Sequence, residues 1–415
     1  CVDVGPYRAF LRTYRDLCTG EHRIRRMSAQ GSVVVGRLRE FGGTIFAEMT
    51  ELAQRHAAVN LGQGFPDWDG PPRMLEIARE QIAGGNNQYP PGRGIADLRA
   101  AIAEDRAARC GQRFDPASEV LVTVGATEAI AAAILGLVEP GSEVVLIEPY
   151  YDSYAAAVAL AGATRVSVPL VRDGRRFVLD LDALRATVGP KTAMIVVNSP
   201  HNPTGTILTD AELRAIAEVA VERDLLVLSD EVYERLTFDA PHAPLASLPG
   251  MAERTITVSS AAKTFNVTGW KVGWALAPKP LLDGVLAAKQ FLTYVGGAPF
   301  QPAVAHALRH EQAWVESLRA SLQAKRDRLS SALDGAGLAP FASEATYFVC
   351  ADVAGLGADD ALRFCRDLPA SRGVAGIPVS VFTDHPESWR TIVRFAFCKA
   401  DAVLEEGVRR LATST

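Results

Sequence analysis

The residue with the clearest chemical potential in this chain is a lysine that follows a strand expected to be buried. Residues 255–258 form a β-branched run, Thr-Ile-Thr-Val, and Lys263 comes shortly after it. Burial lowers the proton affinity of a lysine, and the resulting neutral amine is a nucleophile able to form a Schiff base. The alternative is a lysine whose long stem carries the ammonium group out to solvent. Lys263 is therefore a candidate catalytic nucleophile.

Two further charged residues are associated with apolar strands. Asp230 follows the apolar run at residues 225–228, and Arg394 lies within the apolar run at residues 391–397. A carboxylate at the end of a buried strand is costly unless it meets a cation, although Asp230 also suits the cap of a turn. An arginine inside such a strand needs a carboxylate, which its planar guanidinium group binds with two hydrogen bonds. That carboxylate belongs either to a ligand or to an internal ion pair.

A site for a single phosphate is predicted where a strand meets a helix. Residues 119–124 alternate β-branched and polar side chains, the turn Gly125-Ala126-Thr127 follows, and residues 130–138 form an apolar helix. The N-terminus of a helix exposes unpaired N–H groups and a positive dipole end, which together bind anions. Because the turn lacks the G-x-G-x-x-G pattern of dinucleotide-binding folds, it favours a single phosphate over NAD.

Aromatic and turn-forming residues follow two more predicted strands. The pair Tyr150 and Tyr151 comes after residues 144–147, and an aromatic ring at such a strand end can stack on a planar ligand. Tyr151 is our choice, with Tyr150 as the alternative. An Asn-Pro-Thr-Gly sequence at residues 202–205 follows the strand at residues 193–197, and its composition is typical of a tight turn.

The elements that must position these residues alternate between strands and helices. Further strands are predicted at residues 165–169 and 347–350, and helices at residues 41–56, 95–109, 209–223, 280–290 and 301–333, the last as one long helix. Thr209 and Glu212 are spaced as a capping box at the start of their helix. Because the polar groups follow the carboxyl ends of strands, we expect a mostly parallel α/β sheet with its ligand at that edge.

Composition argues against several classes of function. The chain has 415 residues, is 48% hydrophobic and carries a net charge of −5, so it can bury a large core shared by two domains. Nucleic acid and anionic membranes are not expected as partners, and no apolar run is long enough to span a bilayer. The six cysteines are scattered without metal-ligand spacing, so we expect no metal and a cytoplasmic location. Met27 is a candidate start site, and residues 1–26 are expected to be disordered.

Taken together, these motifs resemble the class I pyridoxal-phosphate-dependent aminotransferases of fold type I. The resemblance involves at least five motifs, among them Ser-x-x-Lys at residues 260–263, Gly-Trp-Lys at 269–271, Gly-x-Gly-x-Pro at 62–66 and Asn-Pro-Thr-Gly at 202–205. It covers nearly the whole chain from about Phe41 onward. It is strongest for the branch that acts on N-succinyldiaminopimelate, kynurenine and methionine.

The resemblance implies an α/β architecture with a large cofactor domain and a smaller domain. The large domain, with a mostly parallel seven-stranded sheet, is expected at residues 65–299, and a small α+β domain at residues 300–415. Residues 41–64 are expected to form an N-terminal arm that packs with the small domain, after an extension at residues 1–40. The resemblance further implies a homodimer whose two subunits share their active sites.

The resemblance also assigns roles to individual residues. Lys263 carries pyridoxal phosphate and serves as general base and acid, Asp230 keeps the ring nitrogen protonated, and Tyr233 bonds the ring oxygen. The other cofactor contacts are Gly125, Ala126, Thr127, Tyr151, Asn198, Asn202, Val232, Ser260, Lys271 and the partner subunit's Tyr89. The substrate contacts are Arg394, Asn202, Gly64, Phe46 and the partner subunit's Tyr294. Lys271 departs from the wider class, which often has arginine at this position.

The activity implied is transfer of an amino group from an amino acid to a 2-oxo acid, with 2-oxoglutarate as the expected acceptor. Because the pocket candidates include no obvious second arginine for a distal carboxylate, strict aspartate specificity is disfavoured. The sequence most resembles the enzymes that act on N-succinyl-LL-2,6-diaminopimelate in lysine biosynthesis. Kynurenine, glutamine and methionine stay open as alternative donors, as does a β-lyase reaction on cysteine conjugates.

Overall fold

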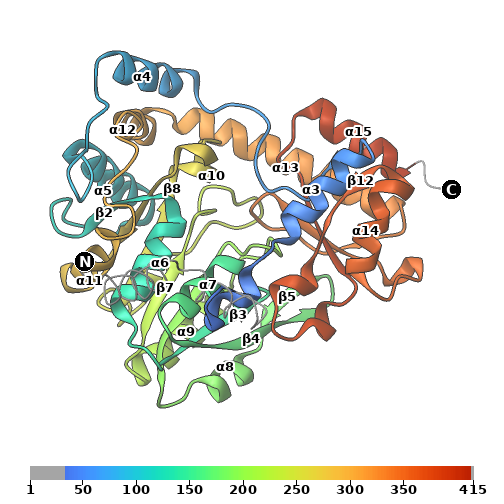
Figure 1. Cartoon of the computed structure of the whole chain (residues 1–415), viewed down its shortest axis with the longest axis horizontal. Coiled ribbons are helices and arrows are strands. Elements are labelled where there is room, and N and C mark those ends of the chain that lie inside the picture. Colours follow the sequence, from blue (N-terminus) through green and yellow to red (C-terminus); the bar gives the residue numbers. More distant parts are fainter. Residues whose placement is uncertain (1–32, 413–415) are drawn as a thin grey trace, which may run out of the picture. The chain divides into compact units, whose positions relative to one another are not determined.

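The computed structural model describes residues 33–412, which belong to two compact units (Figure 1). The first unit, Cys1–Thr44, contributes one 3-10 helix, η1 (Gly36–Phe41), to the described residues. The second unit, Ile45–Thr415, contains the sheets and the cavity described below. Met27 and the predicted disordered segment lie outside the described residues.

The largest sheet has eight strands in the order β2-β9-β8-β7-β6-β3-β4-β5. Their bounds are β2 (Val120–Val124), β3 (Glu143–Glu148), β4 (Thr164–Asp173), β5 (Arg176–Leu179), β6 (Thr192–Asn198), β7 (Leu226–Asp230), β8 (Thr255–Ser260) and β9 (Val272–Leu276). Parallel pairing joins β8, β7, β6, β3 and β4, so the carboxyl ends of these strands meet at one edge. This sheet confirms the α/β class expected from the sequence.

The number of strands is eight rather than the seven that we expected. β4 runs to Asp173, past the predicted end at Pro169, and the chain then turns at Gly174 with a φ of +58°. It returns as β5, which pairs antiparallel with β4. Phe177 and Leu179 on β5 are buried in the core beneath the sheet. Burial of these two apolar side chains stabilises the additional edge strand.

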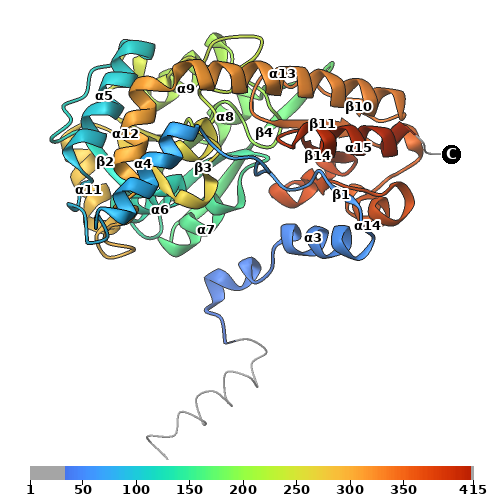
Figure 2. The same ribbon diagram turned by 90° about the horizontal axis from the view of Figure 1, so that it is seen from above.

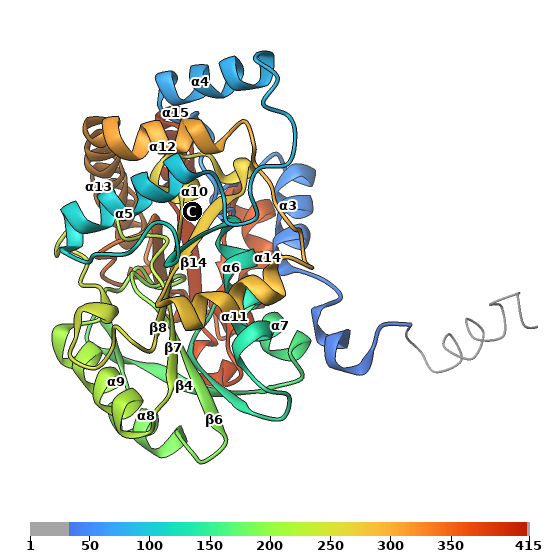
Figure 3. The same cartoon turned by 90° about the vertical axis from the view of Figure 1, so that its left-hand side faces the viewer.

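Helices cover this sheet because its central strands are apolar on both faces. They are α4 (Pro72–Ala83), α5 (Ala96–Cys110), α6 (Gly125–Leu137), α7 (Asp152–Leu160), α8 (Leu181–Thr187), α9 (Asp210–Glu222), α10 (Ala261–Thr264), α11 (Lys279–Lys289) and α12 (Gln301–His310). Three of them, α4, α5 and α12, lie beside one another (Figure 3). They share an apolar cluster with β2 and β9. Thr209 caps α9 and Glu212 completes the predicted capping box.

The single long helix predicted at residues 301–333 is two helices. The first, α12, ends at His310, and the second, α13 (Gln312–Gly335), begins after Glu311. Glu311 has a φ of −104° and a ψ of 29°, outside the α-helical region. The change of direction allows α12 to pack on α4 and α5 while α13 packs on elements of the smaller sheet. A continuous helical pattern in the sequence does not reveal such a break.

The smaller sheet has four antiparallel strands in the order β10-β11-β14-β13. Its strands are β10 (Ala339–Pro340), β11 (Phe348–Asp352), β13 (Ile377–Pro378) and β14 (Ile392–Ala396), and the helices near it are α3 (Ile45–Arg55), α13, α14 (Ala361–Arg372) and α15 (Asp401–Ala412). Near the beginning of this unit, β1 (Val59–Asn60) pairs in parallel with β12 (Val374–Ala375). Figure 2 shows α3 and β1 beside α14 and α15, which come from the other end of the unit. Segments from both ends of the unit therefore share one core.

Five short 3-10 helices complete the described elements. They are η2 (Leu245–Ser247), η3 (Thr268–Trp270), η4 (Ala354–Leu356), η5 (Val379–Phe382) and η6 (Pro386–Trp389). Within residues 33–412, no helix combines the length and the apolar character needed to cross a bilayer. The domain boundaries expected at residues 65 and 300 stay a prediction.

Candidate active site

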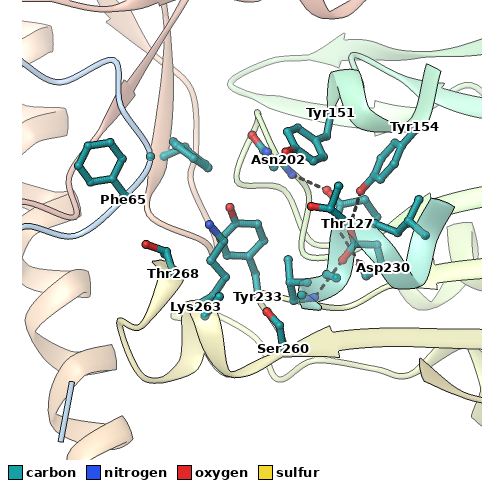
Figure 4. A pocket seen from close by; sticks show the side chains of 18 of the residues that line it. Phe65, Thr127, Tyr151, Tyr154, Asn202, Asp230, Tyr233, Ser260, Lys263 and Thr268 are labelled. Carbon is teal, nitrogen blue, oxygen red and sulfur yellow. Dashed lines mark hydrogen bonds between the residues drawn. The ribbon is translucent and has the colours of Figure 1, made fainter. Parts of the chain in front are cut away.

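A cavity of about 300 Å³ lies at the carboxyl ends of the central strands, beside the N-terminus of α6 (Figure 4). It brings together most of the site residues predicted from the sequence. These are Phe46, Gly64, Gly125, Ala126, Thr127, Tyr151, Asn198, Asn202, Asp230, Val232, Tyr233, Ser260, Lys263, Lys271 and Arg394. They come from segments far apart in the chain, because parallel strands align their carboxyl ends along one edge.

Lys263 lies on the single turn α10, which directly follows the buried strand β8. Its Nζ lies 5.5 Å from the centroid of the Tyr347 ring and 5.8 Å from that of the Tyr233 ring. Burial of the amine is the largest influence on it and lowers the pKa of Lys263 to about 8, although nearby Asp230 acts in the opposite direction. The neutral, nucleophilic form of this amine is therefore well populated at mildly alkaline pH.

Asp230 is the last residue of β7, and its carboxylate faces the cavity. Tyr154 donates its hydroxyl to Asp230 Oδ2 at 2.6 Å, and the main-chain N–H of Val232 donates to Oδ1 at 3.2 Å. Burial raises the pKa of Asp230 to about 6, and these two hydrogen bonds oppose that rise. The bond from Val232 is the one that a turn cap would make, but it engages a single oxygen. A buried carboxylate in a cavity is suited to a cationic ligand group such as a protonated ring nitrogen.

The N-terminus of α6 and Lys271 form a positively charged cradle. Gly125 begins α6 with a φ of +75°, and Lys271 precedes β9 in the left-handed region with a φ of +54°. A Cβ atom at Gly125 would lie 3.1 Å from Nζ of Lys271, so the ammonium group is next to the first turn of the helix. Two positive ends held this close repel each other unless an anion lies between them. The cradle therefore fits a single phosphate group.

Arg394 lies in the middle of β14 and is 2% exposed. Its Nη1 donates to Asn202 Oδ1 and its Nη2 to the carbonyl oxygen of Gly62, each at 3.0 Å. Both acceptors are neutral amide oxygens, and Nε has no hydrogen-bond partner among the described residues. Burial lowers the pKa of Arg394. A buried guanidinium group held by neutral acceptors alone has donor capacity and charge left for an incoming carboxylate.

Aromatic rings enclose this guanidinium group. Its central carbon lies 4.1 Å from the ring centroid of Phe348, 5.4 Å from that of Phe382 and 5.5 Å from that of Phe46. The three rings exclude water from the cation and stabilise it through their π faces. Any hydrogen bond from Arg394 to a ligand is therefore made at low local dielectric, where such bonds are strong.

The two tyrosines at the end of β3 have different surroundings. Tyr151 lines the cavity and is the N-cap residue of α7. Tyr150 is buried, and its hydroxyl bonds Asp384 rather than facing the cavity, so burial together with the Asp384 charge raises its pKa. Of the two alternatives left open by the sequence, the structure places Tyr151 at the site.

Tyr89 and Tyr294 are the two predicted site residues that do not line this cavity. They are 81% and 51% exposed, and their rings meet edge to face with centroids 5.6 Å apart. Both were predicted to serve the active site of a partner subunit, and that role stays a prediction. Their contact places residues from two distant segments together on one surface.

Seven cavity residues were not singled out from the sequence. They are Gln63, Phe65, Ile130, Tyr154, Ala262, Thr268 and Phe348. Tyr154 lies three residues after Tyr151 on α7, and that helical spacing was a usable signal. Phe348 packs above Arg394 from the neighbouring strand β11, a cross-strand contact that local sequence does not reveal.

A buried network of charged residues supports the segment after Asp230. Arg106 donates to Glu231 and Glu234, each at 2.6 Å, and His242 Nε2 lies 2.8 Å from Glu231. The spacing of the two carboxylates and the imidazole would suit a metal ion. Arg106, however, already bonds both carboxylates, so its guanidinium group is the cation of this network. The network anchors the main chain between Asp230 and the residues that follow it.

Known proteins resemble this chain over most of its length. The family model described as aminotransferase class I and II matches residues 57–411. A probable N-succinyldiaminopimelate aminotransferase of Mycobacterium tuberculosis is 61% identical over 92% of this chain and 98% of the relative. A methionine aminotransferase of Escherichia coli is 38% identical over 90% of this chain and 97% of the relative.

Solved structures agree with these sequence comparisons. The structure of N-succinyldiaminopimelate aminotransferase from Mycobacterium tuberculosis has a TM-score of 0.90 and 62% identity, over 92% of this chain and 99% of that chain. The structure of an Escherichia coli protein with a methionine aminotransferase function has a TM-score of 0.87 and 38% identity, over 92% and 99% of the two chains.

Proposed function

Because this chain belongs to the class I and II aminotransferases, we propose that its amino donor is N-succinyl-LL-2,6-diaminopimelate and its acceptor 2-oxoglutarate. The observation that carries this choice is the 61% identity to the Mycobacterium tuberculosis relative over 92% of the chain. The methionine and kynurenine aminotransferases are only 38% and 36% identical. The proposed reaction is a step of lysine biosynthesis.

The cofactor of this enzyme is pyridoxal phosphate, and the cavity fits that molecule. When bound, the cofactor supplies an aldehyde that combines with amines and a protonated ring that withdraws electrons from the substrate. In the proposed arrangement, Ala126, Thr127, Ser260 and Lys271 bind its phosphate at the N-terminus of α6. Asp230 is the counter-charge of the ring nitrogen, and Tyr154 holds that carboxylate in place. The remaining ring contacts are Tyr151, Val232, Asn198, Asn202 and Tyr233.

Lys263 is the residue that moves protons in this proposal. Because the pKa of its buried amine falls to about 8, Nζ can take a proton from the substrate Cα at mildly alkaline pH and release it again. The aromatic rings of Tyr233 and Tyr347 limit the positions that the amine can adopt. Tyr347 is itself held by the hydrogen bond from its hydroxyl to the carbonyl oxygen of Gly64, at 2.6 Å.

Arg394 binds the α-carboxylate of the substrate in this proposal, and Asn202 and Gly62 hold the guanidinium group for it. Phe46, Phe65 and Gln63 form the neighbouring wall of the cavity and surround the substrate side chain. Gln63 donates to the hydroxyl of Thr50 at 2.6 Å, which ties this wall to α3. The side-chain pocket therefore depends on the position of the first helix of this unit.

A steady-state comparison of amino donors tests the proposed substrate. With 2-oxoglutarate as acceptor, kcat/KM for N-succinyl-LL-2,6-diaminopimelate should exceed that for methionine, kynurenine and glutamine by about tenfold or more, because ratios of kcat/KM measure differential transition-state binding. A higher kcat/KM for methionine or kynurenine would assign the chain to that activity instead. Release of ammonia from a cysteine conjugate, measured alongside, tests the β-lyase alternative. A Lys263→Ala variant is the control for turnover without the catalytic amine.

We also propose that the active site is completed by a second copy of the chain. Tyr89 and Tyr294 are exposed on one surface, and in this proposal their hydroxyl groups enter the active site of the partner subunit. Mixing a Tyr89→Phe variant with a Lys263→Ala variant should produce hybrid dimers with one site in which both residues are intact. Recovery of activity on mixing supports the shared site, and a mixture with no more activity than the two separate variants contradicts it.

We also propose a cytoplasmic location, which is supported by the free thiols of Cys110, Cys350, Cys365 and Cys398.

A further inference from the structure

A buried lysine outside the cavity joins the two loops that carry the exposed tyrosines. Lys289 is the last residue of α11 and is 2% exposed. Its ammonium group donates to the main-chain oxygen of Gly92 at 2.9 Å and to that of Tyr294 at 2.5 Å. Removing an ammonium group from water is costly unless oxygen atoms replace its hydration. The two carbonyl groups satisfy that requirement, so Lys289 holds both loops at once.

The two loops depend on each other for their conformation. We name residues 86–94 the first loop and residues 291–298 the second loop. Asn86 in the first loop donates to the carbonyl oxygen of Ala298 in the second at 3.0 Å. Tyr294 has a φ of +62°, which is uncommon for a bulky residue and requires neighbouring contacts to maintain it. The bond from Lys289 to the carbonyl group of Tyr294 is such a contact.

A role confined to the end of α11 does not explain these bonds. A lysine in the last turn of a helix commonly bonds the final carbonyl groups of the same helix. Lys289 bonds residues outside α11, one of them 197 positions away in the sequence. The second loop has a further anchor at its centre, because the hydroxyl of Thr293 donates to Glu128. Glu128 also accepts the main-chain N–H of Val124 at 2.6 Å, next to the proposed phosphate cradle.

We propose that Lys289 is a positioning residue that holds Tyr89 and Tyr294 for the active site of a second copy of this chain. The inference rests on the proposed shared site. Lys289 is not part of the cavity lining found in residues 33–412, so it does not contact a ligand bound in its own subunit. In this proposal its influence on cofactor binding is exerted in trans, through the tyrosines that its subunit lends to the partner.

The first test measures cofactor affinity. A Lys289→Met variant keeps an apolar stem of similar length and loses all three donors, so both carbonyl groups lose their partner. We expect its dissociation constant for pyridoxal phosphate, measured by absorbance titration, to rise about tenfold, as the loss of one well-placed hydrogen bond would cause. Lys289→Arg, which keeps the charge and the donors, should recover most of the affinity. Should Lys289→Met not fold, Lys289→Gln carries the same test with a polar side chain.

A matched control lies on the same helix. Lys279 is the first residue of α11, and its exposed ammonium group pairs with Asp283. A Lys279→Met variant should bind the cofactor within about twofold of the unmodified protein, because exposed ion pairs contribute little. An equal loss of affinity in the Lys279 and Lys289 variants would overturn the proposal, since it would show a general effect of charge on α11.

The second test distinguishes action in trans from action within one subunit. Mixing the Lys289→Met and Lys263→Ala variants gives hybrid dimers. One site of each hybrid has Lys263 from the Lys289→Met subunit. Its tyrosines come from the other subunit, in which Lys289 is intact. That site should regain activity and normal cofactor affinity. If Lys289 supports its own subunit's site, the hybrid stays defective and the proposal is wrong.

The Tyr89→Phe hybrid separates this outcome from failure of the shared site. If the hybrid with Tyr89→Phe regains activity and the hybrid with Lys289→Met does not, the role of Lys289 is wrong and the shared site still holds. Recovery with neither overturns the shared site and, with it, the role of Lys289.

Discussion

At the scale of single residues, the cavity holds three ionisable groups whose burial is unfavourable for folding. Lys263, Asp230 and Arg394 are each almost fully buried, and burial shifts the pKa of each toward its neutral form. Such groups are expected where a protein binds a charged ligand, because the ligand supplies the missing counter-charges. In the protein without its cofactor, these groups therefore lower the free energy of unfolding.

Replacing Lys263 with methionine should stabilise the cofactor-free protein. The pKa of Lys263 is 10.5 ordinarily and about 8 in the folded protein. Between these values the unfolded chain binds more protons than the folded one, so stability rises with pH across that window. Below pH 8 the full penalty is present, and at pH 7 it is about 3 kcal/mol by the linkage relation.

Urea unfolding of the cofactor-free proteins measures this effect. Lys263→Met should be more stable than the unmodified chain by about 3 kcal/mol at pH 7 and by about half of that at pH 9.5. The exposed Lys279→Met variant, with its side chain 61% exposed, should differ by less than about 0.5 kcal/mol at either pH. A stability difference for Lys263→Met that does not change with pH would show that the amine is not buried as the structure has it.

Replacing Arg394 with lysine should impair catalysis without impairing folding. Lysine keeps the positive charge but cannot form the two parallel hydrogen bonds of a guanidinium group with a carboxylate. We expect kcat/KM to fall roughly 10- to 100-fold for every amino donor, since each carries an α-carboxylate. The melting temperature and the visible absorbance of the bound cofactor should stay close to those of the unmodified enzyme. A lower melting temperature with kcat/KM intact would instead identify Arg394 as a structural residue.

At the scale of elements, the phosphate cradle depends on how closely β9 approaches the first turn of α6. A Cβ atom at Gly273 on β9 would lie 2.5 Å from the carbonyl carbon of Gly125 and 2.6 Å from the main-chain nitrogen of Ala126. Main-chain atoms cannot rotate away as a side chain can, so any larger residue must push the strand and the helix apart. Gly273 therefore sets the distance between the sheet and the proposed anion site.

A Gly273→Ala variant should lose both stability and cofactor affinity. Overpacking of this kind costs about 1–3 kcal/mol, and displacement of α6 should weaken binding of the phosphate group. Thermal unfolding and absorbance titration with pyridoxal phosphate measure the two effects. Gly269→Ala is the matched control in the preceding turn, because a Cβ atom there would meet nothing within 4 Å. Two variants that behave alike would show that the close approach at Gly273 has no consequence for the site.

At the scale of the whole molecule, the compact unit from Ile45 onward joins two sheets through segments from both of its ends. Its β1 strand pairs with β12, and Arg394 on β14 reaches the Asn202 turn after β6. Both sheets therefore contribute to one cavity. The proposed dimer adds a second requirement, since the exposed aromatic side chains near the second loop need a partner surface.

A Phe291→Glu variant tests that requirement. Phe291 begins the second loop and is 85% exposed, so a charge there does not disturb the core of the subunit. If this surface meets a second copy, burying the new carboxylate is unfavourable, and the sedimentation profile should shift from dimer to monomer with loss of activity. Val221→Glu on α9, where the native side chain is 43% exposed, is the control and should stay dimeric and active. An active dimer of Phe291→Glu would exclude this surface from the interface.

The amino-acid sequence by itself determined the features that depend on neighbours along the chain. The capping box at Thr209, the lysine after β8 and the aspartate that ends β7 all follow from local patterns of burial and turn formation. The α/β class follows from these local patterns as well, whereas the fold type and most of the cavity lining were predicted from the resemblance to a known family. Local patterns left other points open, such as the choice between Tyr150 and Tyr151 and the identity of the carboxylate that Arg394 binds.

Only the tertiary structure decided what depends on contacts between distant segments. Tyr154 bonds Asp230 from 76 positions away, and Phe348 covers Arg394 from a neighbouring strand. The break at Glu311 and the additional strand β5 likewise follow from packing against other elements. The bond from Lys289 to Gly92 belongs to the same class. The physical reason is that a side chain's partner is set by the arrangement of the backbone in space, which no short stretch of sequence contains.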